Sequence, residues 1–585
     1  MPALAAVSLS ALLLAQGCDS PSGGQARSSG ASQQPADSLS PPYGPCNAAA
    51  VSSEGMVATD APLATRVGAE VLSSGGNAVD AAVATAFALA VVLPMAGNIG
   101  GGGFAVVRTA KGETAALDFR ERAPVAATSD MYIERKGEVT DRSVTGHLAS
   151  GVPGSVAGLR DLHKRYGSMD WKDLVAPAIG LAGDGFTVDS SFAASVADEA
   201  DRLKKFPVSR DLFVPEGNPI PPGTIWRNPD LARTLRRIAE HGPDGFYGGE
   251  TADLIVSEME RGGGLITHED LQSYEAKWRE PVEFNYRGHR IISMPPPSSG
   301  GLTMALIANI LEGYDLPELG RGSPDALHVT AEAMRRSFAY RNHYLGDPDF
   351  VDIPSDVFLS KANAALLRRG ISFDRATPSS EISPGFGTAY GVGDNTTHFS
   401  VVDGEGNAVA LTTTLNLSYG SAVTVAGAGF LLNNEMDDFA ARPGAPNAFG
   451  LVQGEANAIE PGKRMLSSMT PTIVVRDGRT VLITGASGGP RIITGVFQVI
   501  SNVVDHGLDI SDALCAPRIH HQHLPDSLYY ESGGLTEARI AGLKNRGHRV
   551  GPRRGVIAVA ASILRRDSLW TGASDPRVTG SAEGP

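Results

Sequence analysis

A helix that can only be buried is the strongest constraint on how this chain folds. The stretch 79–93, VDAAVATAFALAVVL, is apolar on nearly every side, and a helix of this kind must be covered by protein all round. No apolar run after the first residues reaches the about 20 residues needed to cross a bilayer. The sequence therefore predicts a large layered fold around this helix. It argues against a transporter or a channel.

Composition and charge narrow the class of protein further. With 42% hydrophobic and 19% charged residues, the chain is globular rather than disordered. Its 585 residues suggest roughly four domains at about 150 residues each, although large enzymes often form one unit of this length. Glycine supplies 69 of them, which indicates many tight turns and close backbone approaches. A net charge of −14 argues against a general nucleic-acid binder, which needs a basic face.

The first residues resemble an export signal followed by a tether. An apolar core over 2–17 ends at Cys18; it is too short for a stable membrane span and lacks the usual basic residues before it. Gly17-Cys18 fits a lipoprotein cleavage site with Cys18 acylated, although Gln16 is not the small residue common there; ordinary secretion is the alternative. We predict a signal over 1–18, a disordered Ser-, Pro- and Gly-rich tether over 19–50, and a place in the periplasm, the cell envelope or outside the cell.

The three cysteines, Cys18, Cys46 and Cys515, are too few for a disulfide scaffold. Cys46 and Cys515 would pair in an oxidising compartment only if the fold brings them within bridging range, which spacing alone does not decide. Both outcomes stay open at the level of the sequence.

From residue 52 onward, helix-like and strand-like segments alternate. Leu63, Val67 and Val71 recur at i, i+4 and predict a helix that begins near Pro62 and ends at Gly75-Gly76. The pattern over 160–380 predicts mostly helices and loops. Paired strands are predicted at 104–108 with 114–119, at 398–403 with 408–414 and at 472–475 with 480–484, and an amphipathic helix begins at Pro490. The expected fold is α/β (α+β), with strands stacked against helices on both faces.

Two glycine-rich motifs carry candidate chemistry. In GVGDNTTH (391–398), a flexible approach leads into two threonines at the start of a strand; alone, such a pair reflects β-propensity more often than catalysis. In GASGGPR (485–491), Gly488 and Gly489 lie between a strand and a helix. Their N–H groups at the positive end of that helix would stabilise an oxyanion, although an ordinary strand–helix turn has the same pattern.

Two polar clusters are candidates for binding a charged small molecule. Ser467 and Ser468 offer adjacent hydroxyls just after Lys463 and Arg464. The run NNEMDD (433–438) crowds amides and carboxylates after an apolar strand. Buried, such a cluster would bind an ammonium group; exposed, it would be a solvated turn.

In this order, the motifs resemble those of the γ-glutamyltranspeptidases, which are N-terminal-nucleophile (Ntn) hydrolases. The similarity runs from about 52 to 577 through GMVAT (55–59), GGNAVDAA (75–82), GNIGGGGF (97–104), DFRERAP (118–124), PPPSSGG (295–301), TTHFSVVD (396–403), LLNNEMDDF (431–439), LSSMTPTIV (466–474), GASGGPRIIT (485–494) and GASDPR (572–577). So many ordered motifs are far more specific than any one of them. The resemblance implies a four-layer αββα sandwich of the Ntn-hydrolase type, formed by a large chain (51–395) and a small chain (396–585) after self-cleavage.

The resemblance also implies the chemistry. The precursor would cut itself between Asn395 and Thr396, and the Thr396 hydroxyl would become the nucleophile, with its own α-amine as base near neutral pH. Thr396 would attack the γ-glutamyl amide of glutathione or a related compound, and water, an amino acid or a dipeptide would resolve the γ-glutamyl-enzyme. Thr414 matches a second threonine that hydrogen-bonds the nucleophile. No cofactor or metal is implied, and His398 is expected to be structural.

Substrate recognition carries over residue by residue. Arg120 matches the arginine that holds the α-carboxylate of the glutamyl group, since a guanidinium fork suits a carboxylate. Ser467 and Ser468 match the hydroxyls that assist it, and Gly488 and Gly489 match the oxyanion hole. The groups that hold the α-ammonium correspond to Asn416, Glu435 and Asp438.

Two positions depart from other members of the family. The loop 442–458, RPGAPNAFGLVQGEANA, resembles the lid of many bacterial members. It carries Phe449 where some have tyrosine, so the lid would close by packing. Glu435 stands where others have glutamine. Both changes would alter the preference for the acceptor and leave the site intact.

Three other motifs are weaker. His520-His-Gln-His523 has the residue type of a metal site, but neighbouring residues on one strand or turn do not all point at one ion. The loop 100–103 resembles a phosphate loop but lacks the Gly-Lys-Ser/Thr ending, and close backbone packing is expected there. PPPSSGG is interpreted as a rigid turn near the core rather than a polyproline ligand.

Three rival functions remain. An acylase on the same fold, acting on glutaryl or cephalosporin side chains, would need no site for an α-ammonium. A relative that attaches poly-γ-glutamate to a cell-wall amine is disfavoured by the lid and the chain length. A non-catalytic envelope lipoprotein would have other residues in place of Thr396, Thr414 or the glycine pair, and the sequence has no such substitution. We expect a two-chain enzyme for small molecules, with no nucleic-acid partner and membrane contact only through a lipid anchor.

Overall fold

Two antiparallel sheets stack face to face at the centre of the fold. A computed structural model describes residues 43, 45–134, 138–382, 396–553 and 555–585, and all of them lie in one unit. The first sheet runs, in spatial order, β20 (Ser581–Glu583), β2 (Gly55–Thr59), β10 (Thr396–Asp403), β11 (Ala408–Thr414), β3 (Gly102–Arg108), β4 (Thr114–Phe119) and β7 (Lys277–Arg279).

The second sheet packs on the first through strands at its centre. Its order is β1 (Ala50–Ser52), β19 (Leu569–Ser574), β18 (Val559–Arg566), β13 (Arg479–Thr484), β12 (Thr472–Arg476), β9 (His289–Ser293) and β8 (Val282–Tyr286), with β14 (Ala486–Ser487) beside β18. Strand β10 contacts β18, and β11 contacts β12 and β13. Apolar side chains from both inner faces share one core, which Phe104 and Val106 enter from the first sheet and Ile473 and Ile483 from the second.

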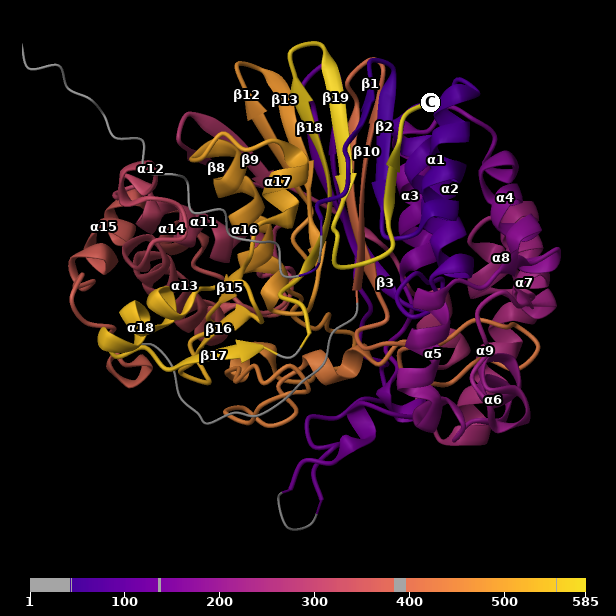
Figure 1. The fold of residues 1–585 in the computed structure, drawn as a ribbon. Coiled ribbons are helices and arrows are strands. Elements are labelled where there is room, and N and C mark those ends of the chain that lie inside the picture. The colour runs from indigo at the N-terminus through magenta and orange to yellow at the C-terminus, as the bar shows by residue number, and fades with distance from the viewer. Residues whose placement is uncertain (1–42, 44, 135–137, 383–395, 554) are drawn as a thin grey trace, which may run out of the picture. The chain divides into compact units, whose positions relative to one another are not determined.

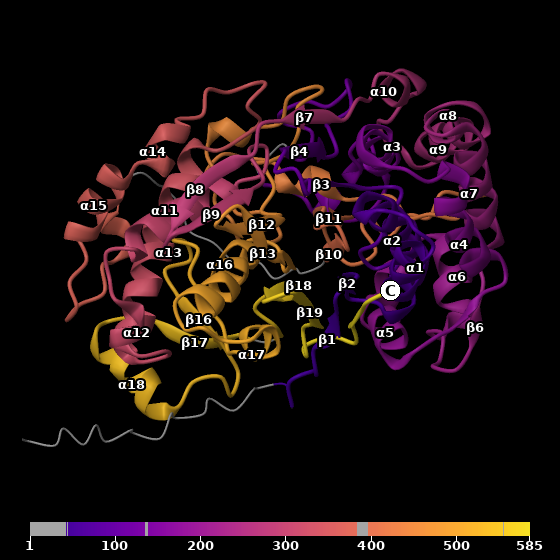
Figure 2. The same ribbon diagram turned by 90° about the horizontal axis from the view of Figure 1, so that it is seen from above.

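Helices cover the outer face of each sheet, and Figure 2 shows the four layers side by side. On the first sheet lie α1 (Pro62–Ser73), α2 (Ala78–Val92) and α3 (Ser155–Tyr166), backed by α4 (Trp171–Gly183), α5 (Ser190–Leu203), α6 (Pro207–Phe213), α7 (Pro229–His241), α8 (Asp244–Tyr247), α9 (Gly249–Gly262) and α10 (His268–Gln272). On the second lie α11 (Gly300–Leu311), α13 (Pro324–Tyr344), α14 (Ser355–Leu359), α15 (Lys361–Arg369), α16 (Arg491–Val504) and α17 (Ile510–Cys515), with α12 (Leu316–Leu319) and α18 (Glu537–Asn545) further out (Figure 1). The predicted layering is confirmed.

Helix α2 is the buried helix that the sequence predicts. Every one of its residues is buried, because α1, α4 and the first sheet enclose it. Asn77 caps its first turn and, with Asp80, forms a capping box. The Asp403 carboxylate, at the turn between β10 and β11, accepts the Ala78 N–H at 3.0 Å. The start of α2 is thereby tied to the strand that begins at Thr396.

The predicted hairpins are confirmed, and the middle of the chain is mostly helices and loops, as expected, with one hairpin that the sequence analysis did not predict. The pairs β3–β4, β10–β11 and β12–β13 form as expected, and α16 begins after its N-cap Pro490. The region 160–380 also contributes the strands β7, β8 and β9, and the short pair β5 (Phe186–Thr187) and β6 (Ile225–Trp226). Residues 282–286 alternate buried and exposed, and Arg287 and Gly288 turn the chain with φ of 49° and 75°. This is a hairpin that the surrounding helical pattern obscured.

A small third sheet packs beside the second helical layer. It holds β15 (Ile519–His520), β16 (Leu528–Glu531) and β17 (Val550–Arg553). Within the described part of the chain, none of the helices has both the length and the apolar character that a membrane crossing requires.

The segments 51–395 and 396–585 share both central sheets. Strand β2 lies between β20 and β10, while β8 and β9 extend a sheet whose centre comes from the later segment. They are therefore two stretches of one interleaved fold rather than separate domains. A disulfide joins Cys46 to Cys515, which answers the question that the sequence left open.

Candidate active site

Thr396 and Thr414 face each other at one end of the central hairpin. Thr396 is the first residue of β10 and Thr414 the last of β11, and the antiparallel register places them directly opposite. The Thr396 hydroxyl donates to the Thr414 hydroxyl at 3.3 Å, and the Asn416 N–H donates to the same oxygen at 2.7 Å. Strand β10 begins two residues earlier than the pattern predicts. The nucleophile candidate is therefore part of the sheet rather than of a loop.

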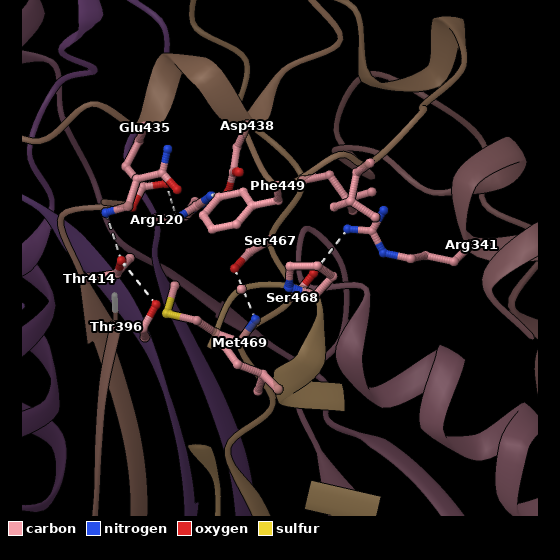
Figure 3. Close-up of a pocket in the computed structure, with 16 residues that line it drawn as sticks. Arg120, Arg341, Thr396, Thr414, Glu435, Asp438, Phe449, Ser467, Ser468 and Met469 are labelled. Carbon is pink, nitrogen blue, oxygen red and sulfur yellow. Dashed lines mark hydrogen bonds and ion pairs between the residues drawn. The ribbon is translucent and has the colours of Figure 1, made fainter. Parts of the chain in front are cut away.

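A small cavity opens beside this pair and gathers most of the predicted site (Figure 3). It encloses about 310 Å³ of empty space, open solvent at its mouth included, which is at the small end of ligand pockets. The predicted residues that line it are Arg120, Thr396, Thr414, Asn416, Glu435, Asp438, Phe449, Ser467, Ser468 and Gly489. Gly488 is not among the lining residues, and Asn395 and Cys18 lie outside the described residues.

A buried arginine surrounded by carboxylates dominates the electrostatics of the cavity. Arg120 is 1% exposed. Its guanidinium pairs with Glu435 at 2.6 Å and with Asp438, and Glu121 lies 3.5 Å away. Its Nε also donates to the carbonyl of Met465 at 3.3 Å. Each of the three guanidinium nitrogens of Arg120 therefore faces an acceptor.

The pKa values of this cluster shift because it is buried. Burial raises the pKa of Glu121 to about 8 and that of Glu435 well above its usual value, although Arg120 opposes both shifts. The pKa of Asp438 is raised as well, again by burial and against Arg120. For Arg120, burial favours a lower pKa, but the three carboxylates outweigh it and the pKa rises. The cluster therefore holds a permanent cation beside carboxyl groups that give up their protons reluctantly.

The opposite wall carries the two serines and an arginine that the sequence analysis missed. The Ser467 hydroxyl accepts the Met469 N–H at 3.1 Å, and the Ser468 hydroxyl accepts from Arg341 at 3.1 Å (Figure 3). Arg341 comes from α13 and also donates to the Ser299 hydroxyl at 3.0 Å. Burial lowers its pKa to about 10. No motif marks Arg341, because α13 lies far away in the sequence from the other residues of the cavity.

The glycine pair lies where a strand passes into α16. Both residues have positive φ, 130° at Gly488 and 57° at Gly489, a region that favours glycine. A side chain at Gly489 would begin 2.6 Å from the ring of Phe449, and one at Gly488 would lie 2.9 Å from the backbone of Ala558. Glycine is therefore required here for space as well as for backbone angle.

The loop with Phe449 is anchored at several points beside the cavity. Buried Asp437 accepts the Ala448 N–H at 2.9 Å and the Ser143 hydroxyl at 2.8 Å. Burial raises the pKa of Asp437 to about 6, against these two hydrogen bonds. Gln453 and Asn457 both donate to the backbone carbonyl of Asp438, at 3.0 and 2.7 Å. The loop and the carboxylate cluster thus share one short segment, 435–438.

Asn416 reaches the cluster through the backbone. It adopts a φ of 79°, and its side-chain amide donates to the carbonyl of Asn434 at 2.9 Å. This bond joins the end of β11 to the segment that carries Glu435 and Asp438.

The weaker motifs have structural roles in the described residues. His398 bonds Thr412 and Ser400 rather than Thr396, and burial lowers its pKa to about 3. A Cβ on Gly101 would lie 2.1 Å from the carbonyl of Thr414, so the loop 100–103 packs closely against backbone, as expected. PPPSSGG is buried, and its Ser299 N–H and hydroxyl both donate to the Ser467 carbonyl, at 2.7 and 2.6 Å.

The side chains of the histidine-rich stretch 520–523 point to different partners, as expected from the sequence. His520 bonds Thr494, His521 bonds Asp526, and His523 bonds the carbonyl of Ser379. A different group, His328 with Glu332 and His548, lies together in the second helical layer. The Glu332 carboxylate there binds Arg335 and Arg336, and these cations oppose a metal ion at that place.

Known proteins of two kinds resemble this chain. The sequence profile of the family described as Gamma-glutamyltranspeptidase matches residues 64–584. A glutathione hydrolase proenzyme of Escherichia coli strain K12 is 47% identical over 526 residues, which cover 90% of each chain. A cephalosporin acylase structure from Bacillus halodurans is 30% identical, with a TM-score of 0.83 over 93% of this chain and 98% of that one.

A second solved structure comes from the same family as the profile. It is a γ-glutamyltranspeptidase of Helicobacter pylori, 47% identical with a TM-score of 0.55, which covers 56% of this chain and 94% of that one. The Ntn-hydrolase fold class predicted from the sequence is thereby confirmed. With the profile spanning 64–584 and nearly half of the residues shared with a full-length relative, the chain belongs to the gamma-glutamyltranspeptidase family.

Proposed function

We propose that this protein is a γ-glutamyltransferase and glutathione hydrolase. The observation that carries the proposal is the cavity in which Thr396 lies with Arg120, Asp438 and two serine hydroxyls. A hydroxyl nucleophile beside groups of both charges suits a substrate that is zwitterionic at one end and has an amide at the other. Family membership supports the same activity.

The nucleophile would first be released by self-cleavage. The Thr396 hydroxyl attacks the carbonyl carbon of Asn395, the C–N bond breaks, and the acyl group passes from nitrogen to oxygen as an ester. Water then hydrolyses this ester, leaving a carboxylate on Asn395 and a free amine on Thr396. The hydrogen bond between the Thr396 and Thr414 hydroxyls supports the proposal, since it orients the attacking oxygen. The new α-amine has a reference pKa of about 7.7–8.0 and serves as base for turnover.

Substrate binding would proceed as an exchange of ion pairs. Arg120 already pairs with Glu435 and Asp438. A γ-glutamyl group brings an α-carboxylate for Arg120 and an α-ammonium for the carboxylate that it displaces. The zwitterion adds one charge of each sign, so the net charge of the cavity does not change, and the displaced carboxylate finds a new cation. Ser467 and Ser468 lie on the facing wall, within reach of the carboxylate.

Turnover would follow the two half-reactions of an acyl transfer. Thr396 attacks the γ-carbonyl, the amine of the leaving group departs, and a γ-glutamyl ester forms on the hydroxyl. Water or the amine of an amino acid or dipeptide then attacks the same carbonyl and frees Thr396. The N–H groups of the Gly488-Gly489 turn would stabilise the oxyanion in both steps. Gly489 is part of the cavity wall, which supports this role.

An acylase remains the second candidate, because a cephalosporin acylase structure is similar over nearly the whole chain. A glutaryl side chain has a carboxylate for Arg120 but no ammonium. It would displace Asp438 or Glu435 from Arg120 and leave that carboxylate buried without a partner, which is costly. The buried carboxylates therefore favour the γ-glutamyl substrate.

We also propose that the protein is exported. The apolar segment before Cys18 and the disulfide between Cys46 and Cys515 support an oxidising compartment. This pairing leaves Cys18 as the third cysteine, at the position where a lipid would be attached. Release of the Cys18→Ala variant from the membrane fraction, with wild type retained, checks the anchor; retention of both would reduce the proposal to secretion without a lipid.

Thr396→Ala is expected to leave a single uncut chain with no turnover of L-γ-glutamyl-p-nitroanilide, with or without glycylglycine. Thr396→Ser keeps a hydroxyl and should yield two chains with measurable activity. Denaturing gels and p-nitroaniline release provide the readouts. Thr397→Ala is the matched control, because the Thr397 hydroxyl donates to Asp60 at 2.9 Å and does not line the cavity. Two chains from Thr396→Ala would refute the assignment of the cleavage site.

Asp438→Asn should lower kcat/KM for L-γ-glutamyl-p-nitroanilide by about 10- to 100-fold, because a hydrogen bond to a charged group contributes about 1.5–3 kcal/mol. Glutaryl-p-nitroanilide lacks the ammonium, so its kcat/KM should change by less than about threefold. The control is Asp437→Asn on the adjacent carboxylate, which faces Ser143 and the lid. Equal losses on the two substrates would contradict a role of Asp438 in binding the ammonium.

Asp437→Ala should raise KM for the γ-glutamyl donor by about fivefold and leave kcat within about twofold. The loop with Phe449 loses the hydrogen bond from the Ala448 N–H, and the segment 141–143 loses the one from Ser143. A hydrogen bond contributes about 1 kcal/mol net, so the loop closes less firmly over bound substrate. Asp437→Asn keeps an acceptor for the Ala448 N–H and should restore KM. Initial rates over a range of donor concentrations measure both constants. A fall in kcat at unchanged KM would instead tie Asp437 to the chemical step.

A further inference from the structure

One covalent bond of the fold links residues on opposite sides of the proposed cleavage site. Cys46 lies just before β1, and Cys515 is the last residue of α17. Their sulfurs are bonded, and their Cα atoms are 5.5 Å apart, within the ordinary range for a disulfide. Cleavage before Thr396 assigns Cys46 to the large chain and Cys515 to the small chain. We propose that the mature enzyme is a covalent pair, with Cys46 of the large chain bonded to Cys515 of the small chain.

The residues around Cys46 contact the later part of the chain through interactions that do not involve the disulfide. The Tyr43 ring lies 4.8 Å from the guanidinium of Arg577. The Asn47 side chain donates to the Ser574 carbonyl at 3.2 Å, and β1 pairs with β19 along Ala50–Ser52. These contacts bring Cys46 to its partner before oxidation, so the pairing follows from the fold and is not an accident of two exposed thiols.

The other end of the bridge is set in the core of the small chain. Cys515 is 3% exposed, and α17 packs against β18 and β19 of the second sheet. Asp509 caps the first turn of this helix through the Asp512 N–H at 2.9 Å. The bridge therefore fastens the start of the large chain to a rigid element rather than to a loop.

The Arg577 contact belongs to a buried ion cluster that stiffens the same region. Arg577 pairs with Glu531 at 2.5 Å and with Asp575 at 2.8 Å, and Arg518 pairs with Asp575 at 2.8 Å. The Arg577 side chain also donates to the carbonyl of Ala516, next to Cys515, at 3.1 Å. The thiol of Cys515 is thus held in one position by groups that surround its helix end.

The oxidation itself needs a partner of known chemical class. Two thiols lose two protons and two electrons as the S–S bond forms, and a thiol oxidoreductase with a disulfide of its own accepts them and becomes a dithiol. Such oxidants act in the compartments outside the cytoplasm. Cleavage before Thr396 consumes water and breaks a C–N bond, so neither reaction supplies atoms or electrons to the other.

The bond changes what the two chains can do after cleavage. The shared sheets already hold them together in the native state, but that hold is lost when the fold loosens. A covalent bridge keeps the partners at a high effective concentration through such openings. It also joins the N-terminal segment, which contains Cys46 and the predicted lipid position Cys18, directly to the chain that carries Thr396. The catalytic chain would then stay attached to the anchored large chain even where the shared sheets open.

This inference rests on the proposed cleavage, and denaturing gels separate the two. Full-length protein is purified after blocking free thiols with iodoacetamide and is run with and without dithiothreitol. We expect one band of the full mature mass without the reductant, and two bands, corresponding to the large chain and to 396–585, with it. Digestion without reduction should yield a peptide pair joined through Cys46 and Cys515 in the mass spectrum.

Variants fix the assignment of the bridge. The double variant Cys46→Ser, Cys515→Ser removes both thiols together, leaving no odd thiol to mispair, and should give two bands under both conditions. Cys18→Ala is the matched control, since it removes the third cysteine and should give the same number of bands as wild type with and without reductant. Two bands from wild type without reductant would overturn the covalent link while supporting cleavage. One band under both conditions would overturn the cleavage, and with it the two-chain enzyme that the bridge is proposed to join.

Discussion

The position of β10 between β2 and β11 is the constraint on which the rest of the site depends. A strand that is paired on both sides has no freedom to slide, because a shift of one residue would move every side chain to the opposite face. Thr396, at its first residue, is thereby fixed opposite Thr414. The Asp403 carboxylate, at the far end, accepts three N–H groups of the hairpin turn and the first N–H of α2. The register of the nucleophile is thus set by contacts along the whole length of the strand.

The cavity beside that strand concentrates charges in a way that a structural core would avoid. Burying ions costs free energy that pairing only partly returns, and apolar residues of equal volume would often be more stable. Glu121, Glu435 and Asp438 all have raised pKa values because of burial, even with Arg120 among them. Such an arrangement is retained at a cost in stability. It becomes intelligible when a ligand carries both a carboxylate and an ammonium, since each then finds an opposite charge that is already desolvated and in place.

The sequence predicts the local elements well and the long-range contacts poorly, for a physical reason. Helix α2 and the hairpins β3–β4, β10–β11 and β12–β13 carry their own periodicity and turn residues. The hairpin β8–β9 has the same signals at Val282–Tyr286 and Gly288, but they lie between long helices and were outweighed. Arg341 and the Cys46–Cys515 pair have no local signal at all, because their roles depend on which distant segments the fold brings together.

The roles of the candidate site residues could be predicted from the sequence only through resemblance to a family. Bare patterns left Thr396 as one of two threonines opening a strand and Gly489 as part of an ordinary turn. The resemblance assigned roles to ten residues that line the cavity, and Gly488 is not among the residues that line it. The resemblance does not predict which hydrogen bonds and ion pairs connect these residues. Asp437, beside Asp438, is an example: it faces away from Arg120 and toward the loop with Phe449.

That arrangement couples substrate recognition to the closure of the site. The segment 435–438 is a single turn of 3-10 helix. Asp438 meets Arg120 on one side, while its own carbonyl holds Gln453 and Asn457 of the lid, and Asp437 holds Ala448. The Phe449 ring lies against Gly489 and leaves no room for a side chain there. A phenylalanine has no hydroxyl to bond across the cavity, so closure here depends on these backbone anchors. In the proposed reaction, a substrate that draws Asp438 toward its ammonium would therefore act on the same short turn that positions the predicted lid beside Gly489.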